Sequence, residues 1–592
     1  MTPYDWHFET VLQPGLYENR SQQVPRGKTI GGTSAMNWMI HNEDSMVQLD
    51  IWEQLLNLTG WNWQTLSTAF RESETFYAPP ANASRALTYD LANHGSTGPI
   101  CSTLQRSVLS LIPDYLEPTL RAAGYAIPQD RNGGNVTGAG FLPLAICPQN
   151  YTRSYAGSAY TAVQSRPNLH VHTNCQVTGI DWQSQTLNSS SIAADGLRFV
   201  NKTSSSNRSQ SIFGREVILS AGTIQSPQIL ELSGVGNRSI LEAVGIQSVI
   251  DLPSVGTDLR DPLMLMYEPL QYNFTVNFTG GEFAQNFIDL EPAQDVLEPE
   301  DYEAASAWLN STASIPGLSD AQFSIFKYLW FNRQPLIELA WQYSNAQTDP
   351  YTLVPLSRGS VHVNSSNPLA PPRIDPNYNS VKAVINGTTV DWDLWFLAKA
   401  SKKYVTDLAS HAPMNQILTR TDPPHNASFE DYQNLIYQRM GTSQHITGGC
   451  PMLPRDAGGV VDAQLLVYGT SNVRVVDGSA FPYQPSAHPM GLTYAMAVRA
   501  ARILQSLQGG GGLTFTEQLP ASNSSSNATA VFPTNSPTAT YNSMGNPTPI
   551  PQTSGGVSNA VATSSSSDAS TEVKTKGSAI FAAAFALMAW IV

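Results

Sequence analysis

Short runs rich in β-branched residues recur along this chain, and helical patterns with Gly and Ser at the junction follow several of them. The runs at 168–173, 216–220 and 472–477 predict strands. Helical patterns at 226–232 and 491–504 follow the second and third runs. A strand that leads into a helix is the repeating unit of α/β proteins, so the sequence predicts an α/β fold.

Size and charge narrow the class of protein. With 592 residues, 41% of them hydrophobic, the chain can bury a large core, and we expect two intertwined domains. A formal net charge of −14 argues against nucleic acid as a partner, because nucleic acid needs a basic face. The segment 265–353 is aromatic, Pro-rich and weakly periodic, and it predicts a separate, less regular domain.

Sequons of the form Asn-x-Ser/Thr recur from end to end and predict a glycosylated protein of the secretory pathway. In that compartment Cys101 and Cys147 either pair or remain free buried thiols, and the residues do not choose between the two. The sequons include Asn57, Asn135, Asn150, Asn201, Asn273, Asn277, Asn386 and Asn426.

The last part of the chain changes in composition. From about Thr514 it is rich in Ser, Thr, Asn, Pro and Ala, which predicts a disordered stalk over 508–577. Small residues at 567–570, a polar spacer and the hydrophobic tail 578–592 follow in the order of a GPI-attachment signal. We therefore expect a secreted or cell-surface protein, GPI-anchored to the membrane. A tail-anchored helix or an uncleaved apolar end are the alternatives, and no signal peptide is visible at the N-terminus.

Three segments carry chemistry. In the first, from Pro25 to Met39, a Gly-Gly pair allows close approach to a flat cofactor, and Thr33 and Ser34 offer amide and hydroxyl donors. The second, from Arg215 to Gly236, predicts a strand, a Gly turn and a helix that opens with Ser226-Pro227 as N-cap and first residue.

The third segment runs from His445 to Leu504 and contains two histidines in loops flanked by Gly or Pro, His445 and His488. Together the three segments resemble the glucose–methanol–choline (GMC) family of FAD-dependent alcohol oxidoreductases, and the resemblance extends from about Trp6 to Leu504. It departs from the family pattern at His41 to Asp44, at Pro262 and at Gly449, where the family commonly has Arg, His and Thr.

The resemblance implies a fold and a set of site residues. The expected fold is α/β, with a GMC-type FAD-binding domain whose Rossmann-like part is incomplete, interleaved with an α+β substrate domain that carries an antiparallel sheet. His445 and His488 are the implied catalytic residues, and no metal site is expected. The implied FAD-binding residues are Gly32, Thr33, Ser34, Asn37, Met39, Val177, Asp477, Gly478, Ala480, Pro489 and Met490.

In this family the chain opens with a βαβ unit whose Gly-x-Gly-x-x-Gly turn holds the pyrophosphate of FAD. No such turn is found here, so we expect an N-terminally truncated chain that lacks its ADP-binding unit. The expected parts are an FAD-binding domain at 1–75 and 161–264, substrate-side and connecting segments at 76–160, a substrate-binding domain at 265–440, an active-site segment at 441–507, the stalk at 508–577 and the tail at 578–592.

The expected reaction is oxidation of a small-molecule alcohol. An imidazole base suits removal of the hydroxyl proton near neutral pH, so we expect His445 to accept that proton while hydride passes to the flavin and His488 fixes the oxygen. Oxygen or a quinone would reoxidise the flavin. The aromatic residues of 265–353 have two interpretations. They line a pocket for an aromatic alcohol or a polyketide, or they form part of the hydrophobic core, which is the more common role of such residues. Two alternatives remain: a non-redox cyclase or dehydratase of secondary metabolism, and an inactive cell-surface glycoprotein.

Overall fold

The computed structural model describes residues 2–508, without 81–82, 106–107, 109–110, Asn188, 204–207, 266–269, 274–286, 343–346, Asp422 and His425. The predicted tail and almost all of the predicted stalk lie outside these residues, as do the sequon at Asn277 and the last two residues of the sequon at Asn273. Within the described part, no helix combines the length and the apolar character needed to cross a membrane.

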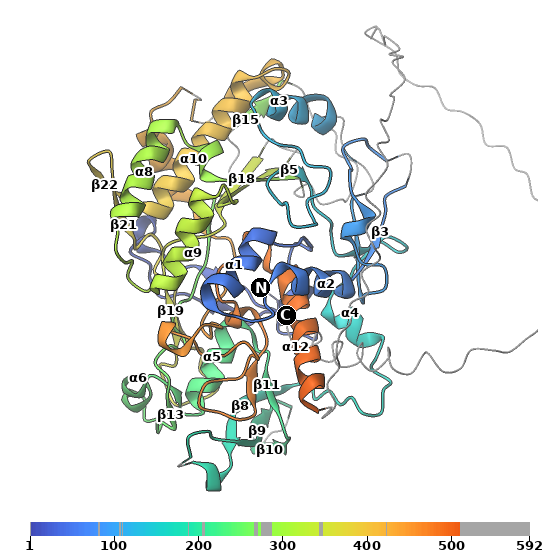
Figure 1. Ribbon diagram of the computed structural model, residues 1–592, viewed down its shortest axis with the longest axis vertical. Helices are drawn as coiled ribbons and strands as arrows, with labels where there is room; N and C mark the ends of the chain where they lie inside the picture. Colours follow the sequence, from blue (N-terminus) through green and yellow to red (C-terminus); the bar gives the residue numbers. More distant parts are fainter. Residues whose placement is uncertain are drawn as a thin grey trace, which may run out of the picture.

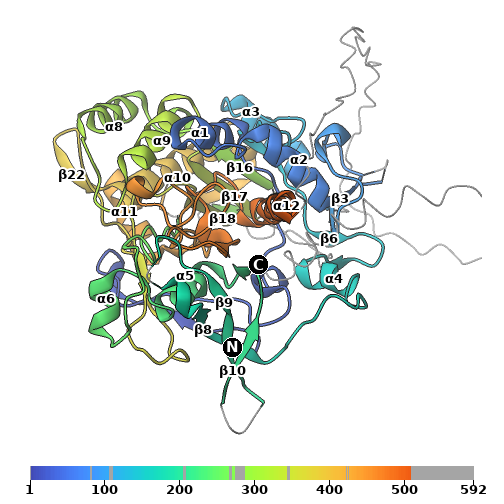
Figure 2. The same ribbon diagram turned by 60° about the horizontal axis from the view of Figure 1, so that its bottom comes forward.

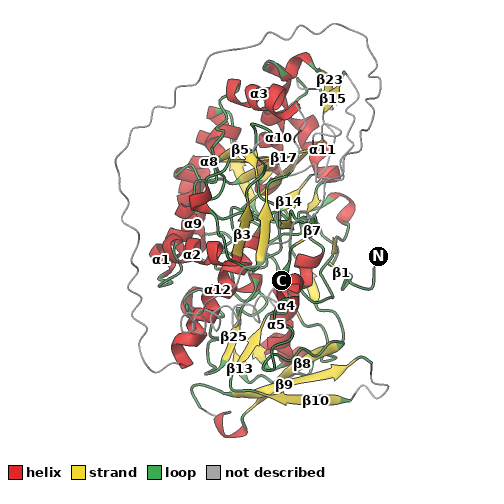
Figure 3. Cartoon of the chain, turned by 90° about the vertical axis from the view of Figure 1, so that its right-hand side faces the viewer, coloured by secondary structure: helices red, strands yellow, loops and turns green. Residues whose placement is uncertain are grey.

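A six-stranded antiparallel sheet forms the centre of one half of the molecule, as expected for the substrate domain (Figure 3). Four of its strands, β5, β16, β17 and β18, are buried on both faces, because helices cover one face and the loops before α12 cover the other (Figure 2). In spatial order they are β24 (Gly441–Thr442), β14 (Leu263–Met264), β18 (Gln347–Thr352), β17 (Ile337–Gln342), β16 (Phe287–Glu291) and β5 (Gly138–Phe141).

Helices α8 (Pro299–Ser311), α9 (Asp320–Phe331) and α10 (Trp392–Ser410) lie side by side next to this sheet (Figure 1). Stacked aromatic rings hold them together, since the ring of Trp392 lies 4.8 Å from that of Trp308 and 5.3 Å from that of Trp330. Where the structure describes the segment 265–353, it consists largely of regular helices and strands, which differs from the less regular region predicted there. Its aromatic side chains create no strong period along the chain because they pack between elements in the core.

The second half of the molecule contains the predicted strand–helix units. Strand β11 (Val217–Leu219) pairs in parallel with β25 (Val473–Val475), and these two strands fall within the predicted runs. The strand predicted at 168–173 is absent, and β8 begins only at Cys175. Strand β8 (Cys175–Trp182) forms a three-stranded antiparallel sheet with β9 (Ala194–Asn201) and β10 (Ser209–Phe213) at the far end of the molecule (Figure 1).

Helix α5 (Gly222–Leu232) begins five residues earlier than the sequence predicts, so Ser226 and Pro227 lie inside it. The Asp477 carboxylate accepts hydrogen bonds from the backbone N–H of Gly222 and from the Ser226 hydroxyl. This contact satisfies a donor of the first turn that no local side chain could reach, and the helix starts where the contact is made.

A disulfide joins Cys101 of β4 (Ile100–Thr103) to Cys147 of β6 (Ile146–Cys147), which decides between the two alternatives that the sequence left open. The remaining described cysteines, Cys175 and Cys450, are free thiols.

Candidate active site

The two predicted catalytic histidines lie next to each other, although 43 residues separate them in the sequence. His445 stands in the loop after β24, and His488 immediately precedes α12 (Pro489–Gln508). Their ring centroids are 4.6 Å apart, with the planes at 75°. They meet because the loop that carries His488, at the start of α12, contacts strands β17 and β18 of the central sheet through Glu338 and Tyr351. Both imidazole rings can therefore contact the same small group of a ligand, each from a different direction.

Two residues of the central sheet complete this cluster. Glu338 of β17 and Tyr351 of β18 are directly paired across the strands, so their side chains emerge on the same face. Nε2 of His488 lies 3.1 Å from Oε1 of Glu338 and 3.0 Å from the Tyr351 hydroxyl oxygen. The Tyr351 hydroxyl donates to the other Glu338 oxygen. No motif marks Glu338 or Tyr351 in the sequence, so neither is among the predicted site residues.

The hydrogen bonds fix which nitrogen of His488 faces the protein. A buried carboxylate accepts only, so Nε2 of His488 carries a proton that points to Glu338, and Nδ1 is the nitrogen left for a ligand. Burial, the charge of Glu338 and the hydrogen bond to it raise the pKa of Tyr351 well above its ordinary value, so its hydroxyl stays a donor.

His445 has the opposite environment. Burial first, and then the positive charges of His488 and Arg26, lower the pKa of His445 well below its ordinary value. It is therefore neutral at physiological pH and able to accept a proton. The two neighbouring imidazoles thus have different surroundings, which suits His445 to act as a base and His488 to act as a hydrogen-bond donor.

Buried amide side chains fix the two histidine loops. Gln484 donates to the carbonyl of His445, and Gln48 of α1 (Met46–Leu56) donates to the carbonyl of Gln484. The backbone N–H of His488 donates to Asn42 at 3.3 Å. Asn42 belongs to the segment His41 to Asp44 that departs from the family pattern, and all four of its side chains are buried. These residues pack beneath the site.

The predicted cofactor loop is a tight turn. Gly31 has a φ of 89°, and a side chain there would meet the backbone of Gly157, so glycine is required. A 3₁₀ helix, Gly32–Ala35, follows. Ser34 donates to the Gly31 carbonyl and accepts from the N–H of Ala156, and Thr33 accepts from the N–H of Gly27.

This loop contacts the start of α12. Nδ2 of Asn37 lies 3.0 Å from Sδ of Met490, and the N–H of Met39 donates to the Asn37 side chain. Because Met490 is two residues beyond His488 and Pro489 begins α12, the histidine pair and the Gly-Gly-Thr-Ser loop share one region. The structure thus brings together seven of the predicted cofactor residues: Gly32, Thr33, Ser34, Asn37, Met39, Pro489 and Met490.

Three of the remaining predicted cofactor residues, Asp477, Gly478 and Ala480, lie in one turn, whose Gly478 carbonyl accepts a hydrogen bond from the N–H of Gly448 in the His445 loop. Asp477 accepts four hydrogen bonds, from Gly222, Ser226 and both donors of Ser479, so its carboxylate is fully used within the protein. The backbone of Gly478 and Ala480 is what this turn can offer a ligand. Val177 stands in β8, on the three-stranded sheet.

The described residues fit the ring half of FAD. Ile30, Met36 and Trp38, on or beside the glycine loop, are each about two-fifths exposed and offer an apolar surface to a flat ring. The N-terminus of α12 adds partial positive charge on the same side. The ADP half of FAD would need a Gly-x-Gly-x-x-Gly turn, and the described residues contain none. The parallel strand pairs next to α5 are β11 with β25, and β12 (Val235–Gly236) with β13 (Ile250–Asp251).

An α/β protein built in this way falls in the class of flavin-dependent oxidoreductases. The model of the GMC oxidoreductase family matches residues 9–264 and 355–497. The chain is 30% identical over 530 residues to the GMC oxidoreductase family protein Mala s 12 of Malassezia sympodialis, which covers 85% of this chain and 83% of that protein. The chain therefore belongs to the GMC oxidoreductase family, and its cofactor is FAD.

Solved structures agree with this assignment. An FAD-dependent oxidoreductase from Chaetomium thermophilum superimposes with a TM-score of 0.77 at 25% identity, covering 86% of this chain and 91% of that one. A fungal aryl-alcohol oxidase superimposes with a TM-score of 0.74 at 25% identity, covering 86% of this chain and 90% of that one.

Proposed function

We propose that this protein oxidises the carbinol carbon of a small alcohol, with an aromatic alcohol or a secondary-metabolite intermediate as the substrate class. The observation that carries the proposal is the contrast between two adjacent imidazoles, one with a lowered pKa and one hydrogen-bonded to a buried carboxylate. The similarity to an aryl-alcohol oxidase supports the aromatic class, as does the Tyr351 ring, which lies 5.5 Å from His445 and 6.0 Å from His488.

Each residue has a separate task in this reaction. FAD, when bound, supplies the acceptor for hydride. Neutral His445 accepts the hydroxyl proton, which places developing charge on the substrate oxygen and makes loss of hydride easier. His488 faces that oxygen with Nδ1, because Glu338 and Tyr351 engage its Nε2, and Nδ1 donates a hydrogen bond to the oxygen when it carries a proton. Oxygen or a quinone is the proposed final electron acceptor.

The test is an anaerobic reaction of the FAD-loaded protein with aromatic and aliphatic alcohols, followed by absorbance at about 450 nm, the flavin band. Bleaching with stoichiometric aldehyde or ketone is the expected result. His445→Ala should slow bleaching roughly 10²-fold to 10⁴-fold, the usual contribution of a general base. The exposed His172→Ala serves as control.

Two results would overturn the proposal. Turnover without bleaching would favour the cyclase or dehydratase reading, and a purified protein that retains no flavin would favour the inactive one.

We also propose that the protein is exported and held at the cell surface by a GPI anchor. The Cys101–Cys147 disulfide supports export, because disulfides persist in oxidising compartments. Release from intact cells by a phosphatidylinositol-specific phospholipase is the expected result, and retention after that treatment would contradict the anchor.

A further inference from the structure

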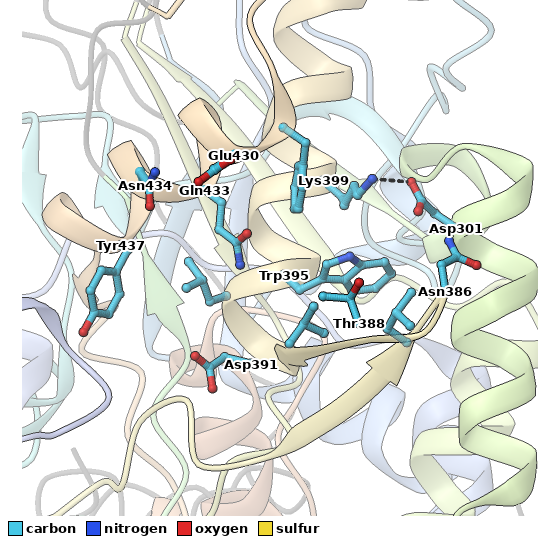
Figure 4. Close-up of a pocket in the computed structure, with 14 residues that line it drawn as sticks. Asp301, Asn386, Thr388, Asp391, Trp395, Lys399, Glu430, Gln433, Asn434 and Tyr437 are labelled. Carbon is cyan, nitrogen blue, oxygen red and sulfur yellow. Dashed lines mark ion pairs between the residues drawn. The ribbon is translucent and has the colours of Figure 1, made fainter.

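A hollow of about 570 Å³ lies between α10, α11 (Phe429–Arg439) and the hairpin of β21 (Lys382–Ile385) and β22 (Thr388–Asp391) (Figure 4). None of the active-site residues lines it. Trp395 of α10 lies at its centre in Figure 4, Tyr437 of α11 stands at one side, and Gln433 and Asn434 provide amide groups.

The charges around this hollow are largely paired. Nζ of Lys399 lies 2.6 Å from Oδ2 of Asp301 and 4.2 Å from the ring centre of Phe429, and Asp391 forms an ion pair with Lys382. A wall of aromatic rings and amides with its charges paired suits a neutral ligand that has many hydroxyl or acetamide groups. Such a ligand stacks its C–H faces on the rings and hydrogen-bonds to the amides.

The hairpin brings a modification signal to this hollow. Asn386 and Gly387 form the turn, with φ of 51° and 77°, values typical of a two-residue hairpin loop. Asn386-Gly387-Thr388 is a sequon, and both of its determinants, Asn386 and Thr388, are exposed and line the hollow. An exposed turn of this kind is accessible to a modifying enzyme.

We propose that Asn386 carries an N-linked glycan whose first N-acetylglucosamine units lie in this hollow. In the transfer, Nδ2 of Asn386 loses a proton and bonds to the anomeric carbon of a lipid-linked oligosaccharide, whose lipid pyrophosphate leaves. The glycan then covers Tyr437 and the amide groups of α11. The proposal requires passage through the secretory pathway and does not depend on the alcohol chemistry of the histidine pair.

The experiment uses the full chain secreted from a eukaryotic host, with glycopeptides mapped by mass spectrometry. Occupancy at Asn386 is expected, and Thr388→Ser should keep it while Thr388→Ala abolishes it. Asn150, which stands in the turn between β6 and β7 (Thr152–Arg153) and does not line the hollow, is the matched reference site. An unmodified Asn386 beside an occupied Asn150 would overturn the proposal.

Release by an endoglycosidase under native conditions tests where the glycan lies. The Asn386 glycan should be released about tenfold more slowly than the Asn150 glycan, which corresponds to about 1.4 kcal/mol of contact energy. Tyr437→Ala should remove this protection, while Tyr328→Ala, an exposed tyrosine on α9, should not. Equal release rates at the two sites in the wild type would show that the glycan projects into solvent and would refute its place in the hollow.

Discussion

Nε2 of His488 lies 3.1 Å from Oε1 of Glu338, whose carboxylate is buried in the central sheet. This contact joins the loop before α12 to strand β17 and fixes which imidazole nitrogen faces the site.

Removing the charge of the Glu338 carboxylate tests the role of this contact. Glu338→Gln should lower kcat/KM for the alcohol roughly 10-fold to 100-fold, a loss of about 1.4 to 2.8 kcal/mol for a buried charge-assisted hydrogen bond. Steady-state kinetics on the FAD-loaded protein measure this effect. The exposed Glu298→Gln is the control, and an unchanged rate in Glu338→Gln would remove Glu338 from the site.

Tyr351→Phe removes one hydroxyl from the same cluster and leaves the hydrogen bond between His488 and Glu338. We expect kcat/KM to fall about tenfold, or about 1.4 kcal/mol, close to the value of one buried hydrogen bond. Because Tyr351 and Glu338 share a network, the double variant should lose less than the sum of the single losses. Strict additivity of the two free energies would contradict a shared network.

The pH profile tests the state of His445. Protonation inactivates a base, and burial together with the positive charges of His488 and Arg26 holds the pKa of His445 well below its ordinary value. Activity should therefore stay constant as the pH falls through about 6.5, where a free imidazole titrates, and decline only in more acidic solution. Arg26→Met should move the acidic limb of kcat/KM upward, while the exposed Lys28→Met should not. An acidic limb at or above pH 6.5 in the wild type would contradict a lowered pKa of His445.

The disulfide should contribute to stability. Cys101 and Cys147 close a loop of 46 residues, for which chain entropy predicts about 4 kcal/mol. A Cys101→Ser/Cys147→Ser variant should lower the Tm in calorimetry. The free thiol variant Cys175→Ser is expected to leave the Tm within about a degree or two, as for most changes away from the core. An equal Tm for the double variant and the wild type would contradict this expectation.

A buried histidine outside the active site should make stability depend on pH. Nδ1 of His94 lies 3.1 Å from Glu74 and Nε2 lies 3.3 Å from Asp130. Burial opposes the charged form, but hydrogen bonds to Asp130 and Glu74 outweigh it and raise the pKa of His94 to about 9.

Since the folded pKa lies above the unfolded value of about 6.5, the ion pairs stabilise the protein fully below about pH 6.5, and this contribution is lost as the pH rises through 9. His94→Gln should cost about 3 kcal/mol in denaturant unfolding at pH 6 and much less at pH 10. A cost that does not change between these two pH values would rule out a charged His94.

The sequence by itself determined the parts of this protein that depend on neighbouring residues. The turn at Gly31, the strands near 217 and 473 and the loops that carry His445 and His488 follow from glycine, proline and β-branched residues close by. The same local motifs indicate the family and its cofactor.

Only the tertiary structure decided what lies opposite the histidines. Glu338 and Tyr351 meet His488 because β17 and β18 pair in one register and the loop before α12 reaches them, and contacts between such distant residues leave no local pattern. The start of α5 was set in the same way, by Asp477 from the other end of the chain. A local pattern predicts which residues form a helix or a loop, but burial and hydrogen bonding across the fold determine which side chains meet.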